Sequence, residues 1–214
     1  MIHEQSAVVL LSGGVDSATC VGIARRKHST VFALSIDYGQ KAKPELQKAR
    51  FLAERFECQH IIISGLDFST WGGSCLTDAK IDIPPRKSTG VGVTYVPARN
   101  TVLIGIAASV AESVGARYVY IGVHSDDYEG YPDCRPEYIG AMKAALFLGT
   151  GAGINLIAPL QYMNKAEIIN LSRTFGITYE ETWSCYAGGG VPCGVCSSCR
   201  NRLQAEKIAD SMGV

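Results

Sequence analysis

Six consecutive residues near the N-terminus, Ser12-Gly13-Gly14-Val15-Asp16-Ser17, have the composition of a phosphate-binding loop. An apolar run precedes them and a helical pattern follows, and the free N–H groups at the start of a helix bind anions. The two glycines let the backbone approach a phosphate without a side-chain clash, and the serines add hydroxyl donors. Asp16 is a candidate ligand for Mg²⁺ or its water shell. In the alternative interpretation this is a plain turn in which Asp16 caps the helix.

The loop matches neither of two common nucleotide motifs. It lacks the Gly-Lys-Ser/Thr ending of the P-loop, which disfavours ordinary transfer of a γ-phosphate, and it lacks the Gly-x-Gly-x-x-Gly spacing of dinucleotide binders. The Ser-Gly-Gly-x-Asp-Ser pattern resembles the pyrophosphate loop of the ATP-pyrophosphatase superfamily, whose members adenylate a substrate and release pyrophosphate. Such chemistry needs fixed donors for the leaving group, and this loop supplies them.

Four of the eight cysteines lie within fifteen residues, as Cys185, Cys193, Cys196 and Cys199. Nearby glycines and a proline allow tight turns, so the spacing permits four sulfurs to converge on one ion. Four thiolates without water form a closed, structural Zn²⁺ site. An iron–sulfur cluster is the alternative, because Cys-x2-Cys-x2-Cys also begins a bacterial ferredoxin motif. We expect the other four cysteines to be small buried hydrophobes: Cys20, Cys58, Cys75 and Cys134.

The composition limits the class of protein. The chain has 214 residues, 47% of them hydrophobic and 19% charged, which is typical of a packed globular protein. Its 20 basic and 20 acidic residues cancel, which disfavours a nucleic-acid or membrane-surface partner. No apolar run reaches the roughly 20 residues that span a bilayer, and residues 1–6 do not resemble a signal peptide. We therefore expect a cytoplasmic protein without a nucleic-acid or membrane partner.

Alternating apolar runs and helical patterns predict an α/β fold. We expect a doubly wound, mostly parallel, Rossmann-like sheet that binds ligands at the carboxyl ends of its strands. Residues 1–180 would form this domain, and 181–214 a zinc-binding segment with a C-terminal helix. The long segment 64–98 has no clear period. The expected strands are 7–11, 30–36, 59–63, 118–122 and 155–157. The strongly apolar composition of 101–114 predicts a buried helix. The other expected helices are 18–27, 44–56, 136–148, 164–175 and one ending near 212.

Together with the loop and the cysteines, four further segments resemble the 7-cyano-7-deazaguanine synthase family from about Ala7 to about Leu203. They are Val96-Pro97-Ala98-Arg99-Asn100-Thr101, His124-Ser125-Asp126-Asp127-Tyr128, Tyr131-Pro132-Asp133-Cys134-Arg135 and Thr182-Trp183-Ser184-Cys185-Tyr186. The strand ending in Asp37-Tyr38-Gly39-Gln40 also fits the family pattern.

The resemblance implies a ligase of queuosine precursor synthesis. It would convert 7-carboxy-7-deazaguanine and ammonia to the nitrile with two ATP, through an adenylated acid and an adenylated amide. It also implies one zinc per chain, held by the four clustered cysteines, and a homodimer. Asp16 and Ser17 would be catalytic. The implied ATP-binding residues are Leu11, Ser12, Gly13, Gly14, Val15, Asp16, Ser17, Ala18, Thr19, Cys20 and Val21.

A guanine-like base needs stacking surfaces and an acid for its N–H edge. Asp127 and Asp133 are the acid candidates, and Arg135 could pair with the substrate carboxylate. In the alternative, Asp133 and Arg135 form a structural pair and the aromatic residues only fill the core. The chain is too short for a glutamine amidotransferase domain, so free ammonia or a partner must supply the nitrogen. The aromatic candidates are Phe68, Trp71, Tyr95, Tyr128 and Tyr131.

Two rival functions share these motifs. An adenylating enzyme that thiolates or modifies tRNA would use the same loop, although zero net charge argues against a large RNA footprint. Local basic groups such as 25–27 and Arg86-Lys87 are more typical of a solvated surface. The second rival is a non-catalytic nucleotide sensor with a zinc-ribbon surface for a partner.

Overall fold

Five parallel strands form the centre of the protein, in the order β3-β2-β1-β4-β5. The computed structural model describes residues 6–85 and 90–212, so Arg86-Lys87 and residues 1–5 lie outside the described part. In the register of the sheet, Ala7 of β1 lies opposite Val31 of β2 and Tyr118 of β4. The strands are β1 (Ala7–Leu10), β2 (Val31–Ile36), β3 (Gln59–Ile63), β4 (Tyr118–Tyr120) and β5 (Asn155–Ile157).

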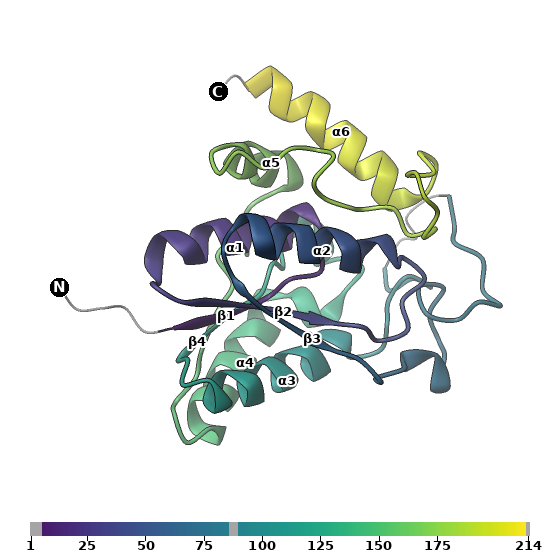
Figure 1. Cartoon of the computed structure of the whole chain (residues 1–214). Helices are drawn as coiled ribbons and strands as arrows, with labels where there is room; N and C mark the ends of the chain where they lie inside the picture. The colour runs from purple at the N-terminus through teal and green to yellow at the C-terminus, as the bar shows by residue number, and fades with distance from the viewer. Residues whose placement is uncertain (1–5, 86–89, 213–214) are drawn as a thin grey trace.

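Helices cover both faces of this sheet (Figure 1). One face carries α1 (Val15–Lys27), α2 (Pro44–Arg55) and α5 (Lys165–Arg173), and the other carries α3 (Arg99–Ser113) and α4 (Pro136–Gly149). The last helix, α6 (Ser197–Met212), lies over α5 as an outer layer. Three single-turn 3-10 helices, η1 (Phe68–Thr70), η2 (Ser125–Asp127) and η3 (Pro132–Cys134), lie in the connections. The expected doubly wound α/β fold is confirmed.

The core has two halves because neighbouring strand residues point to opposite faces. Val8 of β1 packs with Ile104 and Ile139 of α3 and α4. Its neighbour Val9 packs on the other face with Leu52 of α2. Each such buried aliphatic side chain stabilises the fold by about 1.5–3 kcal/mol. The chain runs outward from β1 to β3 and then crosses to β4 on the other side of β1, so the strand order reverses between β1 and β4. Such a reversal opens a crevice at the carboxyl ends of the strands.

Several element boundaries and one burial expectation differ from the sequence analysis. Helix α1 begins at Val15, three residues earlier than expected, so Asp16 and Ser17 belong to its first turn. The expectation that 101–114 is a buried helix is wrong for one side of α3, because this helix packs on the sheet through its other side and exposes Val102 and Gly105. The expected start of α5 is confirmed: Asn164 and Glu167 form a reciprocal capping box. Among the described residues, no helix is both long and apolar enough to cross a membrane.

Candidate active site

A cavity of about 290 Å³ opens at the carboxyl ends of β1, β2 and β4. Ser12 follows β1, Tyr38 follows β2, and His124 follows β4, so each strand delivers a polar residue to it. The first turns of α1, α2, α3 and α5 add Asp16, Glu45, Arg99 and Lys165. Leu76 and Thr94 of the long segment 64–98 also line it. The cavity therefore lies at the edge of the sheet where the topology predicts a ligand.

Hydroxyl groups fix the loop between β1 and α1. The Ser17 hydroxyl donates to the Gly14 carbonyl oxygen at 2.9 Å and accepts from the Ser12 backbone N–H at 3.2 Å. The Ser12 hydroxyl lies 3.1 Å from that of Ser17 and accepts from the Gly14 N–H at 3.3 Å. Because the first N–H groups of a helix have no partner within it, the start of α1 presents donors to the cavity. This loop can hold an anion.

The two glycines of the loop have different roles. Gly13 has a φ of +92°, and a Cβ there would overlap the Glu45 carbonyl oxygen and lie 3.0 Å from the Ala49 nitrogen. Gly13 is also absent from the cavity lining, so it allows the loop to pack against α2. A Cβ on Gly14, by contrast, would be no closer than 3.5 Å to any other atom, and Gly14 lines the cavity. Only Gly14 lies where a phosphate would approach.

The expected ATP-binding segment divides in the same way. Leu11, Ser12, Gly14, Asp16 and Ser17 line the cavity. The remaining members pack inside the protein. Ala18, Cys20 and Val21 lie in the core between α1 and the sheet, and Val15 packs against α5 and α6. The buried Thr19 hydroxyl donates to the Val15 carbonyl oxygen. Those residues position the loop without facing the cavity.

A charged cluster stands beside the loop. Lys165 Nζ lies 2.7 and 2.6 Å from the two carboxylate oxygens of Asp16 and 3.3 Å from His124 Nε2. Burial raises the pKa of Asp16, but Lys165 and His124 more than offset it, so this pKa lies below its usual value. The Lys165 backbone N–H also donates to Asp126 at 3.0 Å. Asp16 is therefore a carboxylate, already paired with a cation.

Of the three residues expected to bind the base, only Asp127 lines the cavity, where its carboxylate lies 3.4 Å from His124 Nε2. Asp133 is buried and accepts from the Asn100 backbone N–H at 2.9 Å, so it caps α3 from outside the helix. Arg135 is exposed and donates to the Tyr128 carbonyl oxygen at 2.9 Å. The structure therefore does not place Asp133 and Arg135 with Asp127, nor does it pair them with each other.

The aromatic candidates are also separated. Tyr131 lines the cavity, where its hydroxyl lies 3.0 Å from that of Thr94. Phe68 is fully buried and Trp71 is exposed, with their rings 4.9 Å apart. Tyr95 accepts from the Ala98 N–H, and Tyr128 donates to the Gln161 carbonyl oxygen. Three aromatic residues that the sequence analysis did not select also line the cavity: Tyr38, Trp183 and Tyr186.

Five acidic, basic or histidine residues of the cavity were missed: Glu45, Arg99, His124, Asp126 and Lys165. Two of them carried a signal. Arg99 and Lys165 are the first residues of α3 and α5, where a positive charge opposes the helix dipole. A basic residue at such a position indicates a requirement other than helix stability.

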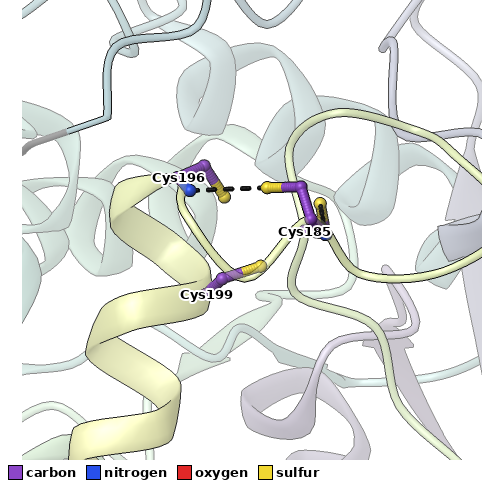
Figure 2. Close-up of side chains that lie close together, drawn as sticks. Cys185, Cys196 and Cys199 are labelled. Atoms are coloured by element: carbon purple, nitrogen blue, oxygen red, sulfur yellow. Dashed lines mark hydrogen bonds between the residues drawn. The ribbon is translucent and has the colours of Figure 1, made fainter.

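The four clustered cysteines do converge. The sulfur atoms of Cys185, Cys193, Cys196 and Cys199 all lie within 4.8 Å of one another. Figure 2 shows Cys185, from a loop, close to Cys196, which immediately precedes α6, and to Cys199, in the first turn of α6. Burial raises the pKa values of Cys185 and Cys199, so a bound cation would supply the charge that keeps them as thiolates. The cluster can hold a metal ion.

The other cysteines are less uniform than expected. Cys20 and Cys75 are fully buried, and Cys58 is half-buried, with a pKa that burial raises to about 11. Cys134 is buried but lines the cavity, and its sulfur accepts from the Asn100 side chain at 3.3 Å.

The cysteine segment is tied to the phosphate loop. The Trp183 backbone N–H donates to the Gly13 carbonyl oxygen at 2.9 Å, and its indole N–H donates to the Cys185 carbonyl oxygen at 2.7 Å. One residue therefore joins the cysteine cluster to the loop between β1 and α1.

The sequence is similar to those of known proteins over nearly the whole chain. A family model described as "Queuosine biosynthesis protein QueC" matches residues 6–209. A 7-cyano-7-deazaguanine synthase from Trichodesmium erythraeum is 47% identical over 210 residues, which cover 93% of this chain and 94% of that protein. One from Prochlorococcus marinus (strain MIT 9301) is 44% identical over 211 residues, covering 95% and 94%.

Solved structures share the fold at low sequence identity. An NMN synthetase from Francisella tularensis has a TM-score of 0.56 and 17% identity, over 99% of this chain and 77% of that one. The U34-tRNA thiolase NcsA from Methanococcus maripaludis, solved with its [4Fe-4S] cluster, has a TM-score of 0.53 and 16% identity, over 98% and 67%. These similarities concern the α/β architecture alone.

Proposed function

Since the chain belongs to the QueC family of queuosine biosynthesis proteins, we propose that it is an ATP-dependent 7-cyano-7-deazaguanine synthase. It converts 7-carboxy-7-deazaguanine and ammonia to 7-cyano-7-deazaguanine through adenylated acid and amide intermediates. The observation that carries this proposal within the structure is the single cavity in which the loop, Asp16, Lys165 and His124 meet.

In the first stage, an oxygen of the substrate carboxylate attacks the α-phosphorus of ATP, and pyrophosphate leaves. Negative charge develops on the phosphate oxygens, and the N–H groups at the start of α1 and the Ser12 hydroxyl, which line the cavity, would donate to them, while the Ser17 hydroxyl holds the loop through its bond to the Gly14 carbonyl oxygen. We propose that Lys165 exchanges its bonds to Asp16 for bonds to this phosphate when ATP binds. Asp16 is then available for Mg²⁺, which neutralises charge on the nucleotide when bound.

Ammonia then attacks the acyl carbon, loses a proton and expels AMP, which leaves the amide. In the second stage, the amide oxygen attacks a second ATP and again releases pyrophosphate. Breaking the carbon–oxygen bond, with loss of the nitrogen protons, gives the nitrile and a second AMP. His124 is our candidate acceptor for these protons, because it lies in the cavity between Lys165 and Asp127.

For the metal site we propose one structural zinc per chain. A tetrahedral zinc with bonds of about 2.3 Å brings four sulfurs close together, in agreement with the 4.8 Å limit on their separations. A [4Fe–4S] cluster would hold its cysteines farther apart, because two iron atoms lie between each pair of sulfurs. Residues 181–214 would then be a metal-stabilised appendage of the α/β domain.

We also propose that the protein is a cytoplasmic homodimer and that no nucleic acid takes part in its reaction. Exposed apolar side chains support association: Phe147 and Leu148 at the end of α4 are 58% and 82% exposed. Apolar surface of this kind is typical of contact regions. Light scattering with a size-exclusion column measures the oligomeric state directly.

The direct test is incubation of the metal-loaded protein with ATP, Mg²⁺, ammonia and 7-carboxy-7-deazaguanine, followed by mass detection of the nitrile and of AMP. We expect two AMP for each nitrile. Formation of AMP only when tRNA is added would point to the tRNA-modifying alternative. Nucleotide binding without turnover under both conditions would indicate a sensor.

A further inference from the structure

Two ionisable side chains of the cavity, Glu45 and Arg99, lack an ion-pair partner within 4.0 Å in the described part of the chain. Glu45 is the second residue of α2 and Arg99 is the first of α3. These helices lie on opposite faces of the sheet, so the two side chains enter the cavity from opposite sides of the sheet (Figure 1).

Arg99 keeps most of its donors unused. One guanidinium nitrogen donates to the Tyr38 hydroxyl at 3.2 Å, and the guanidinium carbon lies 5.8 Å from the centre of the Tyr38 ring. A guanidinium has five N–H groups, and among the described residues no other acceptor takes a hydrogen bond from it. The tyrosine therefore orients a cation whose other donors are free for a ligand.

The Glu45 carboxylate accepts no hydrogen bond from any described residue. Burial raises its pKa to about 7, and the charge of Arg99 offsets only part of that effect. A partly buried charge without a partner is unfavourable unless a ligand compensates for it. Glu45 thus offers two acceptor oxygens to the same cavity as the unused donors of Arg99.

Guanine-type bases present a matching edge. In 7-carboxy-7-deazaguanine, the 2-amino group and N1–H are donors, and O6 and the carboxylate on C7 follow them as acceptors. We infer that Glu45 accepts from the 2-amino group and N1–H while Arg99 donates to O6 and the carboxylate, an assignment that rests on the proposed function. Apolar side chains form the walls around the ring plane: Leu10, Ile36, Leu46, Leu76 and Leu103.

The adenine ring of ATP is the competing occupant, and its edge differs. It pairs one donor, the 6-amino group, with one acceptor, a ring nitrogen. A glutamine can satisfy both atoms, whereas a glutamine facing two adjacent donors loses one acceptor and sets its own amide hydrogens against them. Glu45→Gln therefore weakens binding of a guanine-type base and leaves binding of adenine intact.

The test uses the full metal-loaded chain and calorimetry in the presence of a non-hydrolysable ATP analogue. We expect Glu45→Gln to bind 7-carboxy-7-deazaguanine about tenfold to a hundredfold more weakly, while its affinity for the ATP analogue changes less than about twofold. Glu54→Gln, on the exposed surface of the same helix, is the matched control. Arg99→Lys keeps the charge but loses the planar fork, so it also weakens binding of the base.

A base without the 2-amino group gives a second readout. Wild type should prefer the complete base by about tenfold or more, and Glu45→Gln should lose that preference. If wild type binds and converts the base but Glu45→Gln retains the preference, the inference fails and the proposed function survives. Unchanged affinity of Glu45→Gln for the base, together with tighter binding of the ATP analogue, would place adenine at Glu45 and overturn the inference. If wild type binds no carboxy-deazaguanine, both fail.

Discussion

Replacing Gly13 with alanine should destabilise the folded protein far more than the same change at Gly14. At a φ of +92°, an alanine costs about 1–2 kcal/mol in backbone strain alone. Its Cβ would also overlap the Glu45 carbonyl oxygen, and both that atom and the nearby Ala49 nitrogen belong to the rigid backbone of α2. Overpacking of this kind costs about 1–3 kcal/mol more, so the total is about 2–5 kcal/mol.

Thermal unfolding of the metal-loaded protein measures this effect. For a chain of this size each kcal/mol lowers Tm by about 2–4 °C, so Gly13→Ala should lower it by about 4–20 °C. Gly14→Ala is the matched control, because its φ of −81° suits alanine and its Cβ meets nothing closer than 3.5 Å. We expect Gly14→Ala to lose less than about 1 kcal/mol of stability but to bind ATP more weakly. Equal stability of the two variants would refute the assignment of Gly13 to packing and Gly14 to the phosphate.

Four further changes test other parts of the site. Cys196→Ser should lower the bound zinc, measured by elemental analysis, together with Tm; full occupancy would contradict the four-ligand site. Lys165→Met should reduce the rate of AMP release by about 10²–10³-fold with an unchanged circular dichroism spectrum, whereas the exposed Lys143→Met should not. Asp133→Ala removes the cap of α3, so it should lower the free energy of unfolding in urea by about 1–2 kcal/mol without altering the KM for the base. A raised KM at unchanged stability would instead indicate that Asp133 binds the base. Burial raises the pKa of Glu45 to about 7, so between about pH 4.5 and 7 the carboxyl has lost its proton only in the unfolded state. The stability of the wild type should therefore fall relative to that of Glu45→Gln as the pH rises through this range. No such fall would mean that Glu45 is solvated.

The features that the sequence predicts well are those set by neighbouring residues. Short, mostly apolar runs predict the five strands, and the Asn164–Glu167 pair predicts the start of α5. The cysteine spacing predicts the cluster, because short loops leave four nearby sulfurs few arrangements. The fold class follows from the alternation of these elements.

The features that it misses depend on distant segments. Asp16 forms an ion pair with Lys165, which lies 149 residues later in the sequence, and no local pattern predicts that contact. Asp133 was expected to bind the base, but η3 directs its carboxylate toward the Asn100 N–H. Residue type alone does not distinguish Asp127 from Asp133, because both follow β4 and only the turn geometry decides which one faces the cavity.

The hydrogen bond from Trp183 to Gly13 has a consequence for the order in which the site is completed during synthesis. The phosphate loop leaves the ribosome among the first residues, and β1 must wait for β4 before it is flanked on both sides. The loop then lacks its contact with Trp183 until the cysteine segment has emerged, and the same residue bonds to Cys185. A nascent chain can thus form most of its sheet while the loop between β1 and α1 is still unfinished, and the cysteine cluster could take up a metal ion only at this last stage.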